Sequence, residues 1–113
     1  MRMVLIVAAV PLGNPADASA RLRSAIESAE VIAAEDSRRF HRLASDLATP
    51  FAAKVVSFFE GNERERHEEI LEYLRGDKRV LLVSDAGMPT ISDPGFRLIR
   101  EAIASNIKVC LLY

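Results

Sequence analysis

The segment from Ser84 to Gly95 has the composition of a rigid ligand-binding loop. Two prolines fix its backbone path, and two glycines allow positive φ angles or the close approach of a ligand to the main chain. It is longer than the roughly 2–6 residues that usually join a strand to a helix. The alternative is a stiff turn in which Asp93 caps the next helix. We interpret the segment as a binding wall and Asp93 itself as the cap.

A second glycine loop, from Pro11 to Pro15, follows the first apolar run of the chain. Gly13 permits the backbone to approach a ligand. The loop has neither the G-x-G-x-x-G pattern of dinucleotide-binding folds nor the lysine of a phosphate-binding loop. These absences argue against a dinucleotide or a nucleoside triphosphate as the ligand. Taken alone, an ordinary turn explains this loop equally well.

Polar clusters follow two further apolar runs. Asp36 stands where a carboxylate caps a helix, and contact with a polar ligand is the alternative. Arg38 and Arg42 lie one helical turn apart, so they either meet phosphates or remain solvated. Asn62 can cap the next helix. Glu60 could act as a general base, but nothing in the sequence raises the pKa of its carboxyl.

The sequence gives little support for a metal site, a hydrolytic triad or a reactive cysteine. His41 and His67 have no cysteine or histidine at ligand spacing, which argues against a metal site. No histidine accompanies Ser84 and Asp85 in a pattern typical of a hydrolytic triad. Cys110 lies in an apolar run and is expected to be an inert, buried thiol. A single cysteine also excludes an internal disulfide framework and fits a reducing compartment.

Composition predicts an ordinary globular domain. The chain has 113 residues, of which 50% are hydrophobic and 27% charged, with a net charge of −1. That net charge does not indicate a nucleic-acid-binding protein, although it is compatible with a local basic patch. No apolar run approaches the ~20 residues of a membrane span, so we expect a cytoplasmic protein without membrane contact. Residues 1–10 lack a cleavage site and read as a strand.

Apolar patterning predicts alternating strands and helices. Five continuous apolar runs read as strands, at residues 3–10, 31–34, 54–58, 79–84 and 108–113. Helical spacing predicts four helices whose inward residues are Leu22, Ala25, Ile26 and Ala29; Phe40, Leu43, Ala44 and Leu47; Ile70, Leu71 and Leu74 within 63–75; and Phe96, Ile99 and Ile103. Gly76 is expected as a left-handed C-cap and Asn106 as the residue that closes the last helix.

This alternation predicts an α/β fold with an open, five-stranded parallel sheet and helices on both faces. Right-handed crossovers place the loops after the strands along one edge, where such sheets bind ligands. We expect residues 1–113 to form a single domain. Because the last strand ends at that edge, we also expect the chain to be an excised part of a longer protein.

Four loop segments together resemble the ribosomal RNA small subunit methyltransferase I family, within the tetrapyrrole methylase superfamily. The likeness covers essentially the whole chain, and its most specific part is 84–95. The matching segments are Pro11-Leu12-Gly13-Asn14, Ala34-Glu35-Asp36-Ser37-Arg38, Asn62-Glu63, Ser84-Asp85-Ala86-Gly87 and Ile91-Ser92-Asp93-Pro94-Gly95. Three positions depart from the family: Met88 replaces a usual threonine, Gly61 a usual histidine and Val10 a usual threonine. The exact substrate and activity depend on whether a hydroxyl at position 88 or an imidazole at position 61 is needed to contact the ligand.

The resemblance implies an N-terminal cofactor-binding domain with strand order 3-2-4-1-5, which sets the two glycine loops beside one crevice. S-adenosylmethionine would bind there, against a C-terminal domain absent from this chain. The residues expected to line the cofactor pocket are Pro11, Gly13, Asp85, Ala86, Gly87 and Met88. The residues expected on the substrate side are Asp36, Arg38 and Asn62. No metal is expected, and no residue is assigned as the general base.

Family members 2′-O-methylate a cytidine of small-subunit ribosomal RNA, which is therefore the partner expected for the full-length enzyme. We expect this chain alone to be inactive, and a homodimer is a further expectation. Two alternatives stay open. One is methylation of a tetrapyrrole carbon, and the other is a non-catalytic α/β interaction domain.

Overall fold

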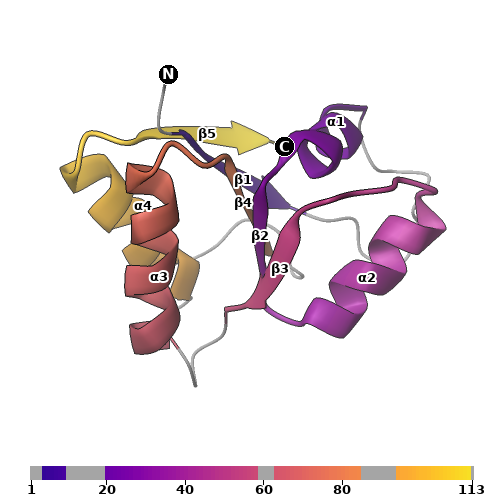
Figure 1. Ribbon diagram of the computed structural model, residues 1–113, viewed down its shortest axis with the longest axis horizontal. Coiled ribbons are helices and arrows are strands. Elements are labelled where there is room, and N and C mark those ends of the chain that lie inside the picture. The colour runs from indigo at the N-terminus through magenta and orange to yellow at the C-terminus, as the bar shows by residue number, and fades with distance from the viewer. Residues whose placement is uncertain (1–3, 10–19, 59–62, 85–93, 113) are drawn as a thin grey trace.

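Strands and helices alternate along the chain, as the apolar runs predict. The computed structural model describes residues 4–9, 20–58, 63–84 and 94–112. Within these residues the elements are β1 (Val4–Ala9), α1 (Ala20–Ser28), β2 (Val31–Ala34), α2 (Ser37–Asp46), β3 (Lys54–Ser57), α3 (Glu63–Arg75), β4 (Val80–Ser84), α4 (Pro94–Ala104) and β5 (Lys108–Leu112) (Figure 1). The strand predictions are therefore confirmed to within a residue or two.

The described strands form one parallel sheet in the order β3-β2-β4-β1-β5, which confirms the predicted order. Its register pairs Ala9 with Ser84, and Ala34 with Val83 on β4 and with Ser57 on β3. All strands point the same way, so their carboxyl ends meet at a single edge of the sheet. The sequence-predicted ligand crevice belongs to that edge.

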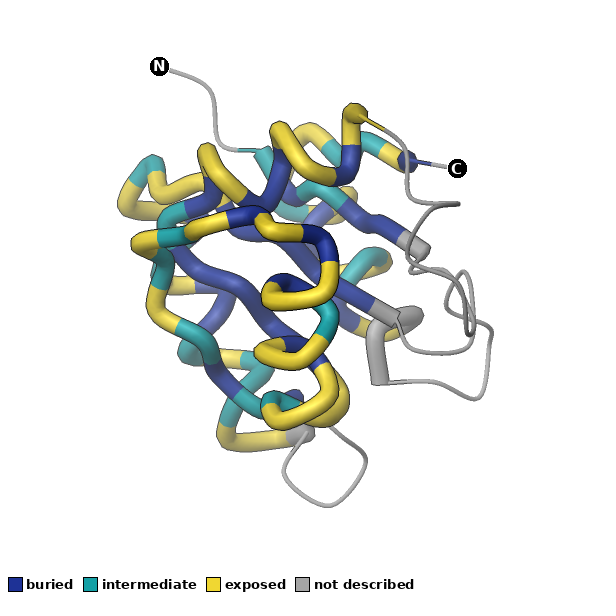
Figure 2. Tube along the Cα trace, turned by 90° about the vertical axis from the view of Figure 1, so that its right-hand side faces the viewer, coloured by how far each residue is buried: buried dark blue, intermediate teal, exposed yellow. Residues whose placement is uncertain are grey.

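The helices cover both faces of the sheet: α1 and α2 lie on one side, and α3 and α4 on the other (Figure 1). Successive strand residues alternate between the two cores, so that Leu81 packs with α1 and α2, whereas Leu82 packs with α3 and α4. Seen from the α1–α2 side, buried strands lie behind helices whose outer residues are exposed (Figure 2). Coverage of both faces explains why the strands are continuous apolar runs.

The predicted inward faces of α1, α2 and α3 are confirmed, with Leu43 only partly buried. The prediction for α4 is wrong at Ile103, which is 60% exposed, whereas Leu98 and Ala102 are fully buried. The buried stripe of α4 passes through the pair at 98 and 102, one residue earlier than expected, and Ile99 flanks it. One residue corresponds to about 100° of rotation around a helix, which turns Ile103 outward. The side chain of Phe96 lies outside the described residues.

The left-handed residue after α3 is Asp77, with φ 65°, and not Gly76 as predicted. Lys78 N donates to Tyr73 O at 3.0 Å and Asp77 N donates to Leu74 O at 3.1 Å, which is the Schellman pattern with Asp77 at its left-handed position. Gly76 stands one residue earlier, at the helix cap. The closing role of Asn106 after α4 is confirmed by its φ of 63°.

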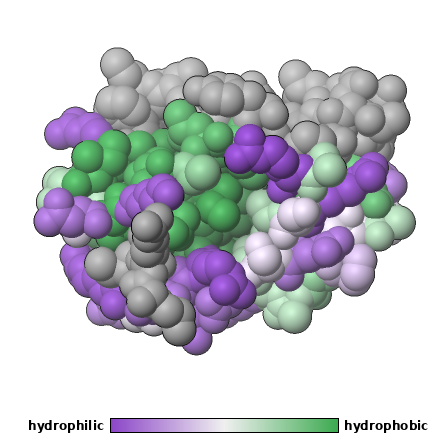
Figure 3. Space-filling view, turned by 90° about the horizontal axis from the view of Figure 1, so that it is seen from above, coloured by the Kyte–Doolittle hydropathy of each residue, from purple (hydrophilic) through white to green (hydrophobic). Residues whose placement is uncertain are grey.

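The free edge of β5 leaves apolar side chains uncovered. Leu111 on this strand is 45% exposed. Figure 3, which views the molecule from the side on which β5 lies in Figure 1, shows a broad apolar surface. Cys110 is half-buried rather than buried, which corrects the sequence prediction. The reason is that β5 has a neighbouring strand on one side only, so its residues receive less cover than those of β4.

A polar network around Glu30 joins the amino ends of β2 and β4, opposite the crevice edge. Arg79 N donates to Glu30 Oε1 at 3.2 Å, Lys78 Nζ lies 3.5 Å from Glu30 Oε2, and Arg79 Nε donates to Ser28 O at 2.8 Å. The hydrogen bond from Arg79 N lowers the pKa of the Glu30 carboxyl. Burial opposes this shift, and the charges of Lys78 and Arg79 lower the pKa further.

Replacing Glu30 with glutamine is expected to lower the free energy of unfolding at neutral pH but not in acid. The folded-state pKa of Glu30 lies below its ordinary value of 4.5. The ionised carboxyl therefore contributes stability above that value, and the contribution disappears as the pH falls through the folded pKa. Urea unfolding between neutral pH and pH ~3 measures the difference between the variant and the parent. Glu27→Gln, on the outer face of α1, controls for the loss of one negative charge. A Glu30→Gln difference that stays constant with pH would contradict this assignment.

Candidate functional site

The carboxyl ends of β1 and β4 lie side by side. The chain leaves β1 at Ala9 and β4 at Ser84, and these two residues are direct partners in the parallel register. Both predicted glycine loops therefore begin from neighbouring strands at one rim of the sheet, as the sequence analysis predicts. The loop residues themselves, Pro11, Gly13, Asp85, Ala86, Gly87, Met88, Asn62 and the proposed cap Asp93, lie outside the described residues. Their ligand contacts stay predictions.

The connections after these two strands diverge. The chain runs from β1 to α1 on one face of the sheet, and from β4 to α4 on the opposite face. Neighbouring strands whose connections part in this way form a topological switch point, where open parallel sheets bind their ligands. The described backbone therefore places the rim between β1 and β4 at such a switch point.

Asp36 caps α2 at the carboxyl end of β2. Its backbone is extended, and Oδ1 accepts hydrogen bonds from Arg38 N at 2.9 Å and from Arg39 N at 3.3 Å. Oδ2 lies 3.9 Å from Arg39 Nε. The capping interpretation of Asp36 is confirmed, because one carboxylate oxygen satisfies two amides that the helix start leaves without partners. A ligand contact by Asp36 stays a prediction.

The outer surface of α2 is basic. Arg38 and Arg42 are exposed, and helical spacing sets them one turn apart, as expected from the sequence. His41 is exposed beside them. Because α2 begins three residues after β2 ends, Arg38 lies near the crevice rim, whereas the later residues lead away from it. This placement suits a contact with a substrate that extends beyond the crevice.

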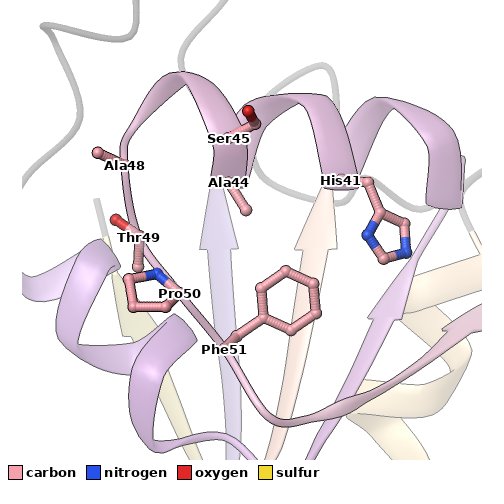
Figure 4. Close-up of a pocket in the computed structure, with 7 residues that line it drawn as sticks. All are labelled: His41, Ala44, Ser45, Ala48, Thr49, Pro50 and Phe51. Carbon is pink, nitrogen blue, oxygen red and sulfur yellow. The ribbon is translucent and has the colours of Figure 1, made fainter.

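The C-terminal half of α2 borders a surface hollow of about 450 Å³ (Figure 4). The helix contributes three lining residues and the segment before β3 contributes four; they are His41, Ala44, Ser45, Ala48, Thr49, Pro50 and Phe51. The Phe51 ring packs edge-on against Phe40 with centroids 5.3 Å apart, and the His41 ring lies 5.5 Å from Phe51.

Sequence reasoning missed this hollow because it considered His41 only as a possible metal ligand. In the structure His41 instead contacts the rings of Phe40 and Phe51. The signal that could have found the hollow is Phe51, an aromatic residue that follows α2 and Pro50.

The described residues lack two kinds of feature. They contain no group of three or more histidine, cysteine, aspartate or glutamate side chains placed to hold a metal ion. Among the same residues, none of the helices combines the length and apolar character needed to cross a bilayer.

Comparison with known proteins identifies one family and a set of similar enzymes. The family model for tetrapyrrole (corrin/porphyrin) methylases matches residues 4–112. The chain is 44% identical over 108 residues to "Ribosomal RNA small subunit methyltransferase I" of Mycobacterium tuberculosis (strain ATCC 25618 / H37Rv). The aligned residues cover 96% of this chain and 38% of that protein.

Proteins of the same name from other bacteria are also similar. That of Thermotoga maritima is 39% identical over 105 residues, covering 93% of this chain and 46% of its own length. That of Bacillus subtilis (strain 168) is 37% identical over 100 residues, covering 87% and 33%. The chain therefore spans less than half the length of these relatives.

Removal of the Asp36 cap is expected to destabilise the protein by about 1 kcal/mol. Asp36→Ala leaves the amides of Arg38 and Arg39 without their acceptor, whereas Asp36→Asn keeps an acceptor and should retain most of the stability. Urea unfolding of the two variants measures the difference. If Asp36→Asn costs as much as Asp36→Ala, the negative charge and not the cap is what matters at this position.

Proposed function

Because this chain belongs to the tetrapyrrole methylase family, we propose that it is the cofactor-binding part of an S-adenosylmethionine-dependent methyltransferase. The proposed reaction is 2′-O-methylation of a cytidine in small-subunit ribosomal RNA. The single observation that carries the proposal is the pairing of Ala9 with Ser84, which starts both glycine loops at one switch point. The names of the relatives support the choice of ribosomal RNA. A cytoplasmic location follows from that substrate.

The sequence at the rim favours a nucleoside cofactor over a phosphate-rich one. The loop after β1 carries a glycine but no phosphate-binding lysine. Bound S-adenosylmethionine would supply an activated methyl group on its sulfonium. Backbone groups of Gly13 and of residues 85–88 are proposed to line the pocket, with Asp85 holding a polar cofactor group or bracing its loop. Glycines at these places let the main chain approach the ligand.

The chain's main contribution to the reaction is positioning. Methyl transfer to a 2′-hydroxyl needs the hydroxyl oxygen in line with the breaking carbon–sulfur bond, so alignment supplies much of the rate. Arg38, Asp36 and Asn62 are proposed on the substrate side, at the ends of β2 and β3. The hydroxyl proton must pass to a base. No described residue is assigned to that role.

A second domain is proposed to complete the pocket. Relatives of this chain are more than twice its length, and β5 ends at the same rim as β1, because Leu112 pairs with Ala8. Residues that follow β5 in a longer protein would therefore emerge beside the crevice. The exposed apolar edge of β5, with Leu111, is proposed as the contact between two copies in a homodimer.

A chimera tests the proposed function. It joins this chain to the remaining C-terminal length of the Mycobacterium tuberculosis relative. We expect titration calorimetry to show S-adenosylmethionine binding at least ~10 times tighter for the chimera than for the chain alone, since each 1.4 kcal/mol of added contact is tenfold. Only the chimera should transfer labelled methyl groups to small-subunit ribosomal RNA.

The matched control is the chimera with Gly87→Val, whose added side chain should block the backbone approach and weaken cofactor binding. Methyl transfer by the short chain alone would contradict the need for a second domain. Labelling of a porphyrinoid acceptor instead of RNA would replace the proposed substrate with the tetrapyrrole alternative. Absence of cofactor binding by the chimera would favour a non-catalytic interaction domain.

A further inference from the structure

The helical layers on the two faces of the sheet differ in charge. Helices α1 and α2 carry five arginines against two carboxylates, which are Arg21, Arg23, Arg38, Arg39, Arg42, Glu27 and Asp46. Helices α3 and α4, on the opposite face, together carry six glutamates against five arginines. The net charge of −1 therefore conceals a basic layer on one face of the sheet. A basic layer on one face is the electrostatic footprint of a polyanion-binding surface.

The basic residues of α2 form a stripe that ends at the hollow. Residues 38, 41 and 45 follow the spacing that aligns side chains on one face of a helix, and Arg42 lies one turn beyond Arg38. All four are exposed. Seven residues separate Arg38 from Ser45, which is about 10 Å along the helix axis. The stripe thus leads from the proposed crevice at the end of β2 to the hollow.

Arg38 and Arg42 are available to an outside anion. Among the described residues, no carboxylate lies within ion-pair distance of either guanidinium. Arg66 and Arg75 on α3 differ in this respect, because they pair with Glu69 at 2.9 Å and with Glu68 at 3.8 Å. Guanidinium groups suit phosphate oxygens, which they can bind through two parallel hydrogen bonds.

The hollow offers an aromatic surface beside these arginines. Phe51 is held by Phe40, and its ring shares the hollow with the tilted ring of His41, at 43° between planes (Figure 4). The hydroxyl of Thr49 is occupied, because it donates to Leu47 O, whereas Ser45 is exposed at the border. At about 450 Å³ the hollow is in the size range of small-ligand sites. Aromatic rings beside arginines are the usual platform for unpaired bases.

We propose that this surface binds single-stranded RNA, with Arg38 and Arg42 on successive phosphates and an unpaired base in the hollow against His41 and Phe51. The inference rests on the proposed function and extends it, since it assigns the path of the substrate strand away from the methyl-transfer rim. A duplex keeps its bases stacked and paired, so it cannot place one in the hollow without opening. The surface therefore selects unpaired RNA.

Fluorescence anisotropy with a 5′-fluorescein single-stranded RNA 12-mer of mixed sequence tests the phosphate contacts, using the 113-residue chain without cofactor. Arg38→Ala/Arg42→Ala should weaken binding at least ~10-fold at low salt. It should also reduce the slope of log affinity against log salt by about 1.4, which is roughly 0.7 for each lost contact to a single strand. Arg64→Ala/Arg75→Ala on α3 removes the same charge and should change affinity less than ~2-fold. No RNA binding by the parent chain, or equal losses in the two double variants, would overturn the proposal.

His41→Ala tests the hollow, because its side chain is exposed and its removal leaves the contact between Phe51 and Phe40 in place. The variant should bind the single strand about fivefold more weakly with an unchanged salt slope, as expected for loss of stacking. Parent-like binding by His41→Ala, together with equally tight binding of a duplex, would overturn the role of the hollow.

The two proposals fail separately. A chimera that methylates RNA while Arg38→Ala/Arg42→Ala binds RNA normally would overturn this inference alone. RNA binding that depends on α2, in a chimera that binds no cofactor, would overturn the proposed function alone.

Discussion

The parallel pairing of β1 with β4 sets the position of the proposed ligand crevice. The pairing brings Ala9 and Ser84 together at the carboxyl edge, and the following connections lead to opposite faces of the sheet. The pairing is secured by burial, since Leu81 and Leu82 of β4 point into different cores and each is covered by two helices. The topology alone therefore favours this rim as the position of the proposed crevice.

Around that crevice the fold separates three tasks. The rim between β1 and β4 is proposed to hold the cofactor, and the opposite edge fastens β2 to β4 through Glu30 and Arg79. The basic surface of α2 is proposed to carry the RNA strand. Charge is distributed accordingly, with the positive layer on the α1–α2 face, which is why the net charge alone argued against nucleic acid.

Residue patterns predicted the strands and most inward helix faces because burial on both sides of a parallel sheet leaves continuous apolar runs. The strand order came from the family resemblance. Two predictions failed because they were displaced by one residue along a helix. Asp77 and not Gly76 is the left-handed residue after α3, and Ile103 of α4 faces outward. Features set by tertiary neighbours were also missed, such as partial exposure of Cys110 at the sheet edge and the hollow closed by Phe51. The cofactor residues stay predictions, since they lie outside the described part of the chain.

One measurement tests the crevice most directly: nuclear Overhauser spectroscopy of the isotopically labelled chain with saturating S-adenosylhomocysteine, the product of the proposed reaction. The account predicts amide contacts between residues 12–15 and residues 85–88, with ligand-induced shifts centred on Ala9 and Ser84. Shifts centred on Glu30 and Arg79, at the amino edge, with no contact between the two loops, would contradict it.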